Sequence, residues 1–182
     1  MAENKRSRGH HGEHQGREDL TGEHRLGDAG QAAFAVLFAV VYIVDSFFLR
    51  WTTFLNEIVP LWVQLVIGIP LLIAAGYLAL VSMKPVFEEV RDPPVVIRTG
   101  LYAWMRHPMY LSEVLLYVGL LALSLSLAAA AVWLLAIVFL FALCRYEEKL
   151  LIERFGDDYR AYMREVPMWL PRPWRRARTS PE

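Results

Sequence analysis

The sequence predicts an all-α, polytopic membrane protein with about four transmembrane helices, including a C-terminal helical hairpin that is followed by a cytoplasmic amphipathic helix. Two observations carry this prediction. Hydrophobic residues make up 55% of the 182-residue chain, and they gather in long unbroken runs instead of recurring at the period of a half-buried helix or strand. The basic residues gather in alternate segments between these runs, as they do when a chain crosses a membrane repeatedly.

The first two apolar runs each have the length of one membrane crossing. Residues 32–49 form a run of 18 that is broken only by Asp45, and residues 58–81 form a run of 24 without a charge. A bilayer core requires roughly 20 apolar residues in a helix, so each run predicts one span. A carboxylate inside a span is costly and usually faces the protein interior. Asp45 therefore either faces inward or lies close enough to the outer boundary to reach water.

The third apolar run is too long for one crossing. Residues 114–144 are 31 uncharged residues, about 45 Å of helix against a hydrocarbon core of roughly 30 Å. The most polar point of the run is Ser124-Leu125-Ser126. We therefore expect a break there, between a short helix over residues 108–123 and a second helix over residues 125–143.

The basic residues predict the orientation. The N-terminal tail holds five Lys and Arg, the first loop one, the second loop four, the Ser124 turn none and the segment after the last run nine. Lys and Arg accumulate on the cytoplasmic side, so this alternation agrees with four crossings and puts both termini in the cytoplasm, with the cell inner membrane as the expected location.

The domain boundaries follow from the same patterns. We expect a disordered cytoplasmic tail over residues 1–30, a membrane-embedded domain over 31–171 and a basic C-terminal tail over 172–182 that is drawn to anionic membrane lipid. The histidines of the first tail are too irregularly spaced to predict a metal site. Nucleic-acid binding is not expected, and the oligomeric state is left open.

The end of the second loop concentrates aromatic and ionisable side chains beside the membrane. Pro108 suits the first turn of the next helix, which places Arg106 and His107 just before a helix N-terminus. Unpaired amides at such a terminus favour an anion. Tyr110 and Glu113 follow at helical spacing, so they can line one face together with His107. The alternative is that Arg106 and His107 only anchor the helix at the headgroup layer.

The segment after the last run predicts a helix that emerges from the membrane. Glu147 and Glu148 fall at the membrane surface, on the side of the Arg-His-Pro segment, and Gly156 marks a break. In the alternative interpretation, the glutamates belong to a solvated face and pair with Lys and Arg. An apolar face recurs at spacings of three and four residues: Leu151, Phe155, Tyr159 and Tyr162.

Together these two segments resemble the isoprenylcysteine carboxyl methyltransferase family, along with the related phospholipid methyltransferases. The family pattern is a Gly-x-Tyr-x-x-x-Arg-His-Pro-x-Tyr run before a helical hairpin, then Glu-Glu, Phe-Gly, two acidic residues, Tyr and Val-Pro. The resemblance covers about residues 95–171, and Leu101 stands where the family commonly has Pro. The matching residues are Gly100, Tyr102, Arg106, His107, Pro108, Tyr110, Glu147, Glu148, Phe155, Gly156, Asp157, Asp158, Tyr159, Val166 and Pro167.

The resemblance implies an enzyme that transfers a methyl group from S-adenosylmethionine to a carboxylate or head group of a lipid-like or prenylated acceptor. The absence of a Gly-rich loop between a strand and a helix excludes a soluble Rossmann-type methyltransferase. The implied cofactor-binding residues are Tyr102, Arg106, His107, Pro108, Tyr110, Glu147 and Glu148, and the implied catalytic residues are Arg106, Glu148 and Arg145.

The implied roles follow the charges of the ligand. The methionine carboxylate is expected at the Pro108 helix start with Arg106 or His107, and the ammonium at Glu147 or Glu148. A carboxylate acceptor would need a positioning cation such as Arg106 or Arg145, whereas an amine acceptor would need a base such as Glu148 or His107. The sequence does not choose between these acceptors.

Two other functions remain alternatives. Membrane sterol reductases, which use NADPH, also carry an Arg-His-Pro-x-Tyr segment followed by a Glu, and Glu113 fits that pattern, although Met109 stands where they commonly have Asn. The other alternative is a membrane scaffold that has kept the fold and lost the activity.

Overall fold

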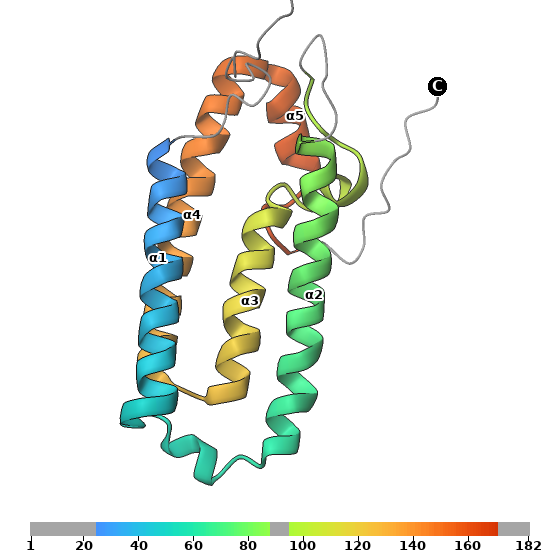
Figure 1. The fold of residues 1–182 in the computed structure, drawn as a ribbon. Helices are drawn as coiled ribbons and strands as arrows, with labels where there is room; N and C mark the ends of the chain where they lie inside the picture. Colours follow the sequence, from blue (N-terminus) through green and yellow to red (C-terminus); the bar gives the residue numbers. More distant parts are fainter. Residues whose placement is uncertain (1–24, 88–94, 171–182) are drawn as a thin grey trace, which may run out of the picture.

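The computed structural model describes residues 25–87 and 95–170 of the chain (Figure 1). Most of the expected N-terminal tail and all of the basic C-terminal tail lie outside the described residues. Within them every regular element is helical: α1 (Arg25–Ile43), the π-helix η2 (Val44–Leu49), the short 3-10 helices η3 (Phe54–Glu57) and η4 (Gly100–Ala103), α2 (Leu61–Phe87), α3 (Pro108–Ser124), α4 (Leu127–Phe155) and α5 (Asp157–Glu165).

The long helices run side by side as a bundle, in which α1 packs mainly on α4 and α2 mainly on α3 (Figure 1). Three segments are long and apolar enough to cross a membrane: Gly27–Leu49, Leu61–Lys84 and Leu127–Phe155. The fourth apolar helix, α3, has 17 residues, about 25 Å of helix. Large side chains such as Ile73 and Val138 remain exposed on the outside of the bundle, where a bilayer would cover them. The expected all-α membrane architecture is confirmed, while α3 remains shorter than the three segments long enough to cross a membrane.

The predicted break in the long apolar run is present. Helix α3 ends at Ser124, and Leu125 takes a left-handed backbone conformation with φ of 50°. Ser126 then caps α4, because its Oγ accepts a hydrogen bond from the Ala129 amide at 3.1 Å. The polar residues that marked the break in the sequence therefore act as the helix terminators.

Glycines at the helix interfaces set how closely the bundle packs. A Cβ atom at Gly119 of α3 would lie 2.8 Å from Leu72 of α2, and one at Gly68 would meet Leu123 in return. Small residues of this kind let membrane helices approach each other closely. The close fit of α2 on α3 thus depends on two positions without a side chain.

The start of α1 corrects one sequence prediction. We expected a disordered tail as far as residue 30, but residues 25–30, the first that the structure describes, are helical and belong to α1. Gly27 and Gly30 face Leu143 and Phe139 of α4 with no room for a Cβ atom. Packing against α4 therefore extends the helix into a stretch whose polar composition alone predicted disorder.

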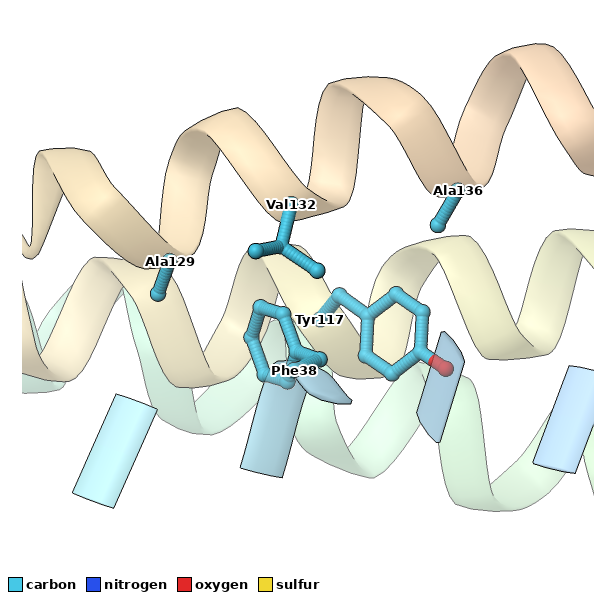
Figure 2. Close-up of a cluster of buried hydrophobic side chains, with 5 residues drawn as sticks. All are labelled: Phe38, Tyr117, Ala129, Val132 and Ala136. Carbon is cyan, nitrogen blue, oxygen red and sulfur yellow. The ribbon is translucent and has the colours of Figure 1, made fainter. Parts of the chain in front are cut away.

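The core of the bundle is a cluster of five side chains (Figure 2). The rings of Phe38 and Tyr117 stack with their centroids 4.4 Å apart. The residues of α4 that cover them are small, namely Ala129, Val132 and Ala136. This cluster fills the middle of the bundle and bounds the site described below.

A buried carboxylate joins the segments at the end of the bundle that holds η2 and the start of α4. Asp45 of η2 is only 5% exposed, and it accepts hydrogen bonds from the hydroxyls of Thr52 at 2.5 Å and Ser126 at 2.6 Å and from the Thr52 amide at 3.2 Å. The Thr52 hydroxyl in turn accepts from the Ala128 amide at 2.9 Å. Asp45 therefore faces the protein interior and joins the end of the first span to the start of α4.

Replacing Asp45 by Ala is expected to destabilise the protein by about 2–3 kcal/mol, because it leaves buried hydroxyls without their charged acceptor. The measurement is the thermal unfolding midpoint in detergent. Glu57→Ala is the matched control, since Glu57 is an exposed carboxylate in the same region. Equal midpoints for the two variants would show that the Asp45 contacts do not stabilise this end.

Candidate functional site

A cavity of about 460 Å³ opens at the end of the bundle that carries α5 and the loop before α3. All four long helices contribute to its wall. Its volume lies within the roughly 300–1,000 Å³ that is usual for sites of small molecules. Among its lining residues are Asp28 and Gln31 of α1, Met83 of α2, Tyr110 and Glu113 of α3, and Glu147 of α4.

Local backbone features place the side chains of the site. Gly100 takes a φ of 60°, which favours glycine, and begins the 3-10 turn that carries Tyr102. Pro108 occupies the first turn of α3, as predicted. Gly156, with a φ of 57°, ends α4 and lets α5 turn back over the bundle. The predicted helix start at Pro108 and the predicted break at Gly156 are confirmed.

The chain after α5 returns to the segment before α3. The backbone amides of Arg106 and His107 donate to the carbonyls of Pro167 and Met168, at 2.9 and 3.0 Å. The Tyr162 hydroxyl donates to the Tyr102 carbonyl at 2.6 Å. The two sequence segments that carry the family resemblance are thus in direct contact.

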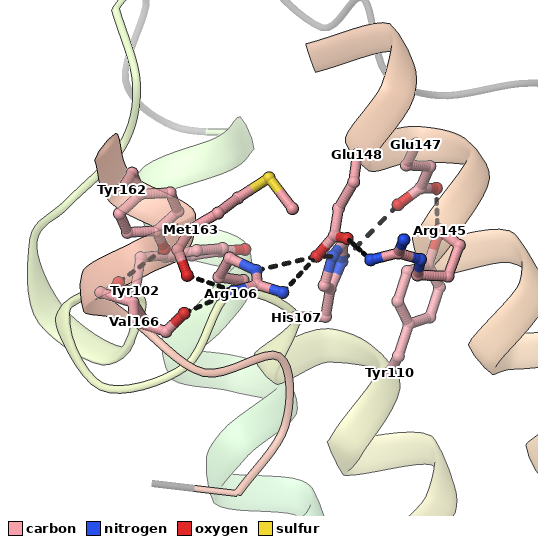
Figure 3. Close-up of polar contacts among 10 residues, drawn as sticks. All are labelled: Tyr102, Arg106, His107, Tyr110, Arg145, Glu147, Glu148, Tyr162, Met163 and Val166. Atoms are coloured by element: carbon pink, nitrogen blue, oxygen red, sulfur yellow. Dashed lines mark hydrogen bonds and ion pairs between the residues drawn. The ribbon is translucent and has the colours of Figure 1, made fainter. Parts of the chain in front are cut away.

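A buried ion pair joins these segments to α4 (Figure 3). The Arg106 guanidinium contacts Glu148 Oε1 through Nε at 2.8 Å and through Nη2 at 2.7 Å, and the two side chains are 9% and 2% exposed. Its Nη1 donates to the carbonyls of Met163 at 3.0 Å and Val166 at 2.5 Å. Arg106 is therefore already bound to a carboxylate and to two carbonyl groups of the protein.

The second oxygen of Glu148 has a weaker partner. Arg145 Nη1 lies 3.3 Å from Glu148 Oε2, and the Arg145 side chain is 56% exposed. Arg145 does not line the cavity. The predicted catalytic residues thus meet around one carboxylate, with Arg106 buried on one side and Arg145 near the surface on the other.

His107 lies between the two adjacent glutamates (Figure 3). Its Nδ1 is 3.7 Å from Glu147 Oε2, and its Nε2 is 3.4 Å from Glu148 Oε1. The Nε2 atom is buried and makes no hydrogen bond. The imidazole stacks on Tyr110 with a centroid distance of 5.7 Å, and the Tyr110 hydroxyl donates to Glu147.

Tyrosines form a further part of the cavity wall. Burial raises the pKa of Tyr102 above its usual value, and the charge of Glu147 adds to this rise. Burial likewise raises the pKa of Tyr159 and of Tyr162. All three tyrosines therefore stay neutral around pH 7. Tyr159 and Tyr162 also belong to the apolar face that the sequence predicted, which packs as a buried cluster with Val166.

The structure separates two roles within the predicted set of site residues. Six of these residues line the cavity: Tyr102, Arg106, His107, Pro108, Tyr110 and Glu147. Glu148 is 1% exposed and lies behind them. Sequence reasoning missed Asp28 and Gln31 of α1, which also line the cavity. Their spacing of three residues at the start of an otherwise apolar helix was the signal that pointed to them.

Comparison with known proteins relates the chain to methyltransferases. Residues 63–158 match the phospholipid methyltransferase family. The cobalt-zinc-cadmium resistance protein CzcN of Cupriavidus metallidurans is 32% identical over 111 residues, which cover 57% of this chain and 50% of that protein. The protein-S-isoprenylcysteine O-methyltransferase of Saccharomyces cerevisiae is 33% identical over 78 residues, 42% of this chain and 33% of that protein.

A third relative is named for a different methyl acceptor, methanethiol. Methanethiol S-methyltransferase 1 of Bradyrhizobium diazoefficiens is 35% identical over 86 residues, 47% of this chain and 28% of that protein. The matched part of the chain thus spans half or less of the length of these relatives.

Replacing Glu147 and Glu148 by Gln in two separate variants tests whether the two residues have different roles. Glu148→Gln is expected to destabilise the protein by about 3–5 kcal/mol, because it leaves the buried Arg106 guanidinium without its counter-charge. Glu147→Gln is the control, because its amide oxygen can still accept from Tyr110. Thermal unfolding midpoints in detergent measure both effects. An equal loss in the two variants would contradict the assignment of Glu148 to the internal framework.

Proposed function

Since this chain belongs to the phospholipid methyltransferase family, we propose that it is an integral membrane enzyme that transfers a methyl group from S-adenosylmethionine to a lipid-like acceptor. The cavity at the α5 end carries the proposal. It combines a carboxylate, Glu147, with aromatic faces and with the first turn of α3, and its wall includes the His107 imidazole.

The chemistry of the lining fits this methyl donor, which carries an ammonium, a carboxylate and a sulfonium. Glu147 would hold the ammonium, because a carboxylate forms its strongest hydrogen bonds with charged donors. The first-turn amides of Met109 and Tyr110, together with His107, would hold the carboxylate, since such amides have no partner within the helix. The face of Tyr102 or Tyr110 would meet the sulfonium.

The buried ion pair has a positioning role in this proposal. Arg106 holds Glu148 from two nitrogen atoms, and Glu148 in turn lies 3.4 Å from the His107 imidazole. Arg145 supports the same carboxylate from the exposed side. We therefore assign Arg106, Glu148 and Arg145 to the support of the cofactor-binding residues, and Glu147 and His107 to direct contact.

The mechanism requires alignment and exclusion of water more than proton transfer. When bound, S-adenosylmethionine supplies an electrophilic methyl group on a good leaving group. The residues of the chain then have to hold the acceptor in line and keep water away. The buried, neutral tyrosines and the covering helix α5 suit that task.

The membrane setting points to the class of acceptor. The cavity opens within a bundle whose outer surface is apolar. The chain matches the phospholipid methyltransferase family and is similar to a protein named for isoprenylcysteine methylation. We propose a lipid-like or prenylated acceptor with its polar head in the cavity. The distribution of basic residues supports the cell inner membrane, with both termini and the α5 end on the cytoplasmic side.

Calorimetry of the purified protein with S-adenosylhomocysteine, the demethylated product of the donor, tests the proposal. We expect saturable binding, whereas NADPH at the same concentration should give no binding heat. Glu147→Gln should weaken the binding by about 10–100-fold, the value of a hydrogen bond between charged groups. Glu153→Gln is the control, because Glu153 is an exposed carboxylate of the same helix. Binding of NADPH in place of S-adenosylhomocysteine would overturn the proposal.

A further inference from the structure

Two carboxylates of the cavity, those of Asp28 and Glu113, have no part in the proposed donor site. Glu113 lies five residues into α3 from Pro108, about 7.5 Å along the helix axis, and it lines the cavity. It accepts hydrogen bonds from the Gln31 amide at 3.1 Å and from the Tyr117 hydroxyl at 2.6 Å. Both donors are neutral, so the charge of Glu113 is not balanced by them.

The position of Glu113 in the bundle carries a free-energy cost for its charge, which suggests that the carboxylate has a function. It belongs to an apolar helix of the bundle and adjoins the core cluster through Tyr117. Carboxylates inside membrane helices are costly and usually mark a path or a ligand site. A carboxylate offers about four lone-pair sites, and the two hydrogen bonds to Glu113 leave acceptor capacity toward the cavity.

The charges around the cavity favour a cationic ligand. Three carboxylates line it, from Asp28, Glu113 and Glu147. Among the lining residues that the structure describes, Arg106 is the one Lys or Arg side chain, and it is already paired with Glu148. An anionic acceptor head at Glu113 would meet like charge, whereas an ammonium would meet the opposite charge at short range.

We propose that Glu113 is the acceptor site of this cavity, where it binds the ammonium head of a lipid-like amine and takes a proton from it. This inference rests on the proposed function and names its substrate class. The loss of one N–H proton to the Glu113 carboxylate frees the nitrogen lone pair. The nitrogen then forms the new C–N bond with the methyl carbon while the C–S bond breaks and leaves its electron pair on sulfur.

Charge is conserved in this step. The proton sits on Glu113, the methylated nitrogen carries the positive charge that the sulfonium loses, and the sulfur product is neutral. Glu113 releases its proton to solvent through the open cavity. In this arrangement Glu147 and the start of α3 serve the donor, and Glu113 with Gln31 serves the acceptor.

The competing explanation is that Glu113 only ties α1 to α3 through Gln31 and Tyr117. Two variants separate the explanations. Glu113→Gln removes the charge but keeps an amide that can accept from Tyr117 and donate to Gln31. Tyr117→Phe removes one of the two hydrogen bonds and keeps the charge. If Glu113 only joined the two helices, Tyr117→Phe would weaken the structure more than Glu113→Gln.

The test measures binding of three amphiphiles with one chain length and different heads, namely dodecylamine, dodecanol and dodecanoate. Each is titrated by calorimetry into the full-length protein in a neutral maltoside detergent, with S-adenosylhomocysteine already bound. We expect dodecylamine, which is protonated at pH 7, to bind at least about tenfold more tightly than dodecanol, and dodecanoate to bind most weakly. Glu113→Gln should bind dodecylamine and dodecanol equally, while Tyr117→Phe should keep the preference.

The outcomes distinguish this inference from the proposed function. Glu113→Gln should bind S-adenosylhomocysteine as the wild type does, which also shows that it folds. If the wild type binds S-adenosylhomocysteine but binds dodecanoate as tightly as dodecylamine, the inference is wrong and the proposed function stands. A preference for the amine that persists in Glu113→Gln, or loss of S-adenosylhomocysteine binding in that variant, would also overturn it. Should that variant not fold, the comparison of the amine with the carboxylate on the wild type decides alone.

Discussion

The buried pair of Arg106 and Glu148 is the interaction on which the rest of the site depends. It connects the loop before α3 with α4, and the two carbonyls that Arg106 also binds belong to α5 and the residue after it. A guanidinium can do this because its planar set of donors serves a carboxylate and neighbouring carbonyls at once. The pair acts together with the backbone hydrogen bonds from Arg106 and His107 to Pro167 and Met168, and it is the part of this contact that is buried and charged.

This constraint explains why two adjacent glutamates have different environments. Successive residues of an α-helix point about 100° apart, so a helix that turns Glu148 toward Arg106 turns Glu147 along the cavity wall. Glu148 becomes an internal anchor, and Glu147 lines the cavity. His107 lies between the two glutamates. Its Nε2 atom faces Glu148, and its Nδ1 atom faces Glu147.

The length of α3 creates the space that the site occupies. In Figure 1 the upper end of α3 lies below the upper ends of α1, α2 and α4, and residues of the loop before α3, of α4 and of α5 line the cavity beside it. At the opposite end Asp45 performs the closing role, again as a buried carboxylate that joins distant segments. The family match at residues 63–158 includes the cavity residues of α2, α3 and α4 but not those of α1, which supplies Asp28 and Gln31.

The sequence by itself determined the helices and their ends, because these depend on local properties. Apolar runs set the spans, Pro108 and Gly156 set two helix ends, and the serines near Leu125 set the hairpin. Three outcomes required the packed structure: which glutamate is the anchor and which faces the cavity, that residues 25–30 are helical, and that Gln31 meets Glu113 across 82 positions of sequence. Those outcomes depend on how helices rotate and pack against one another, and no local pattern in the chain records that rotation.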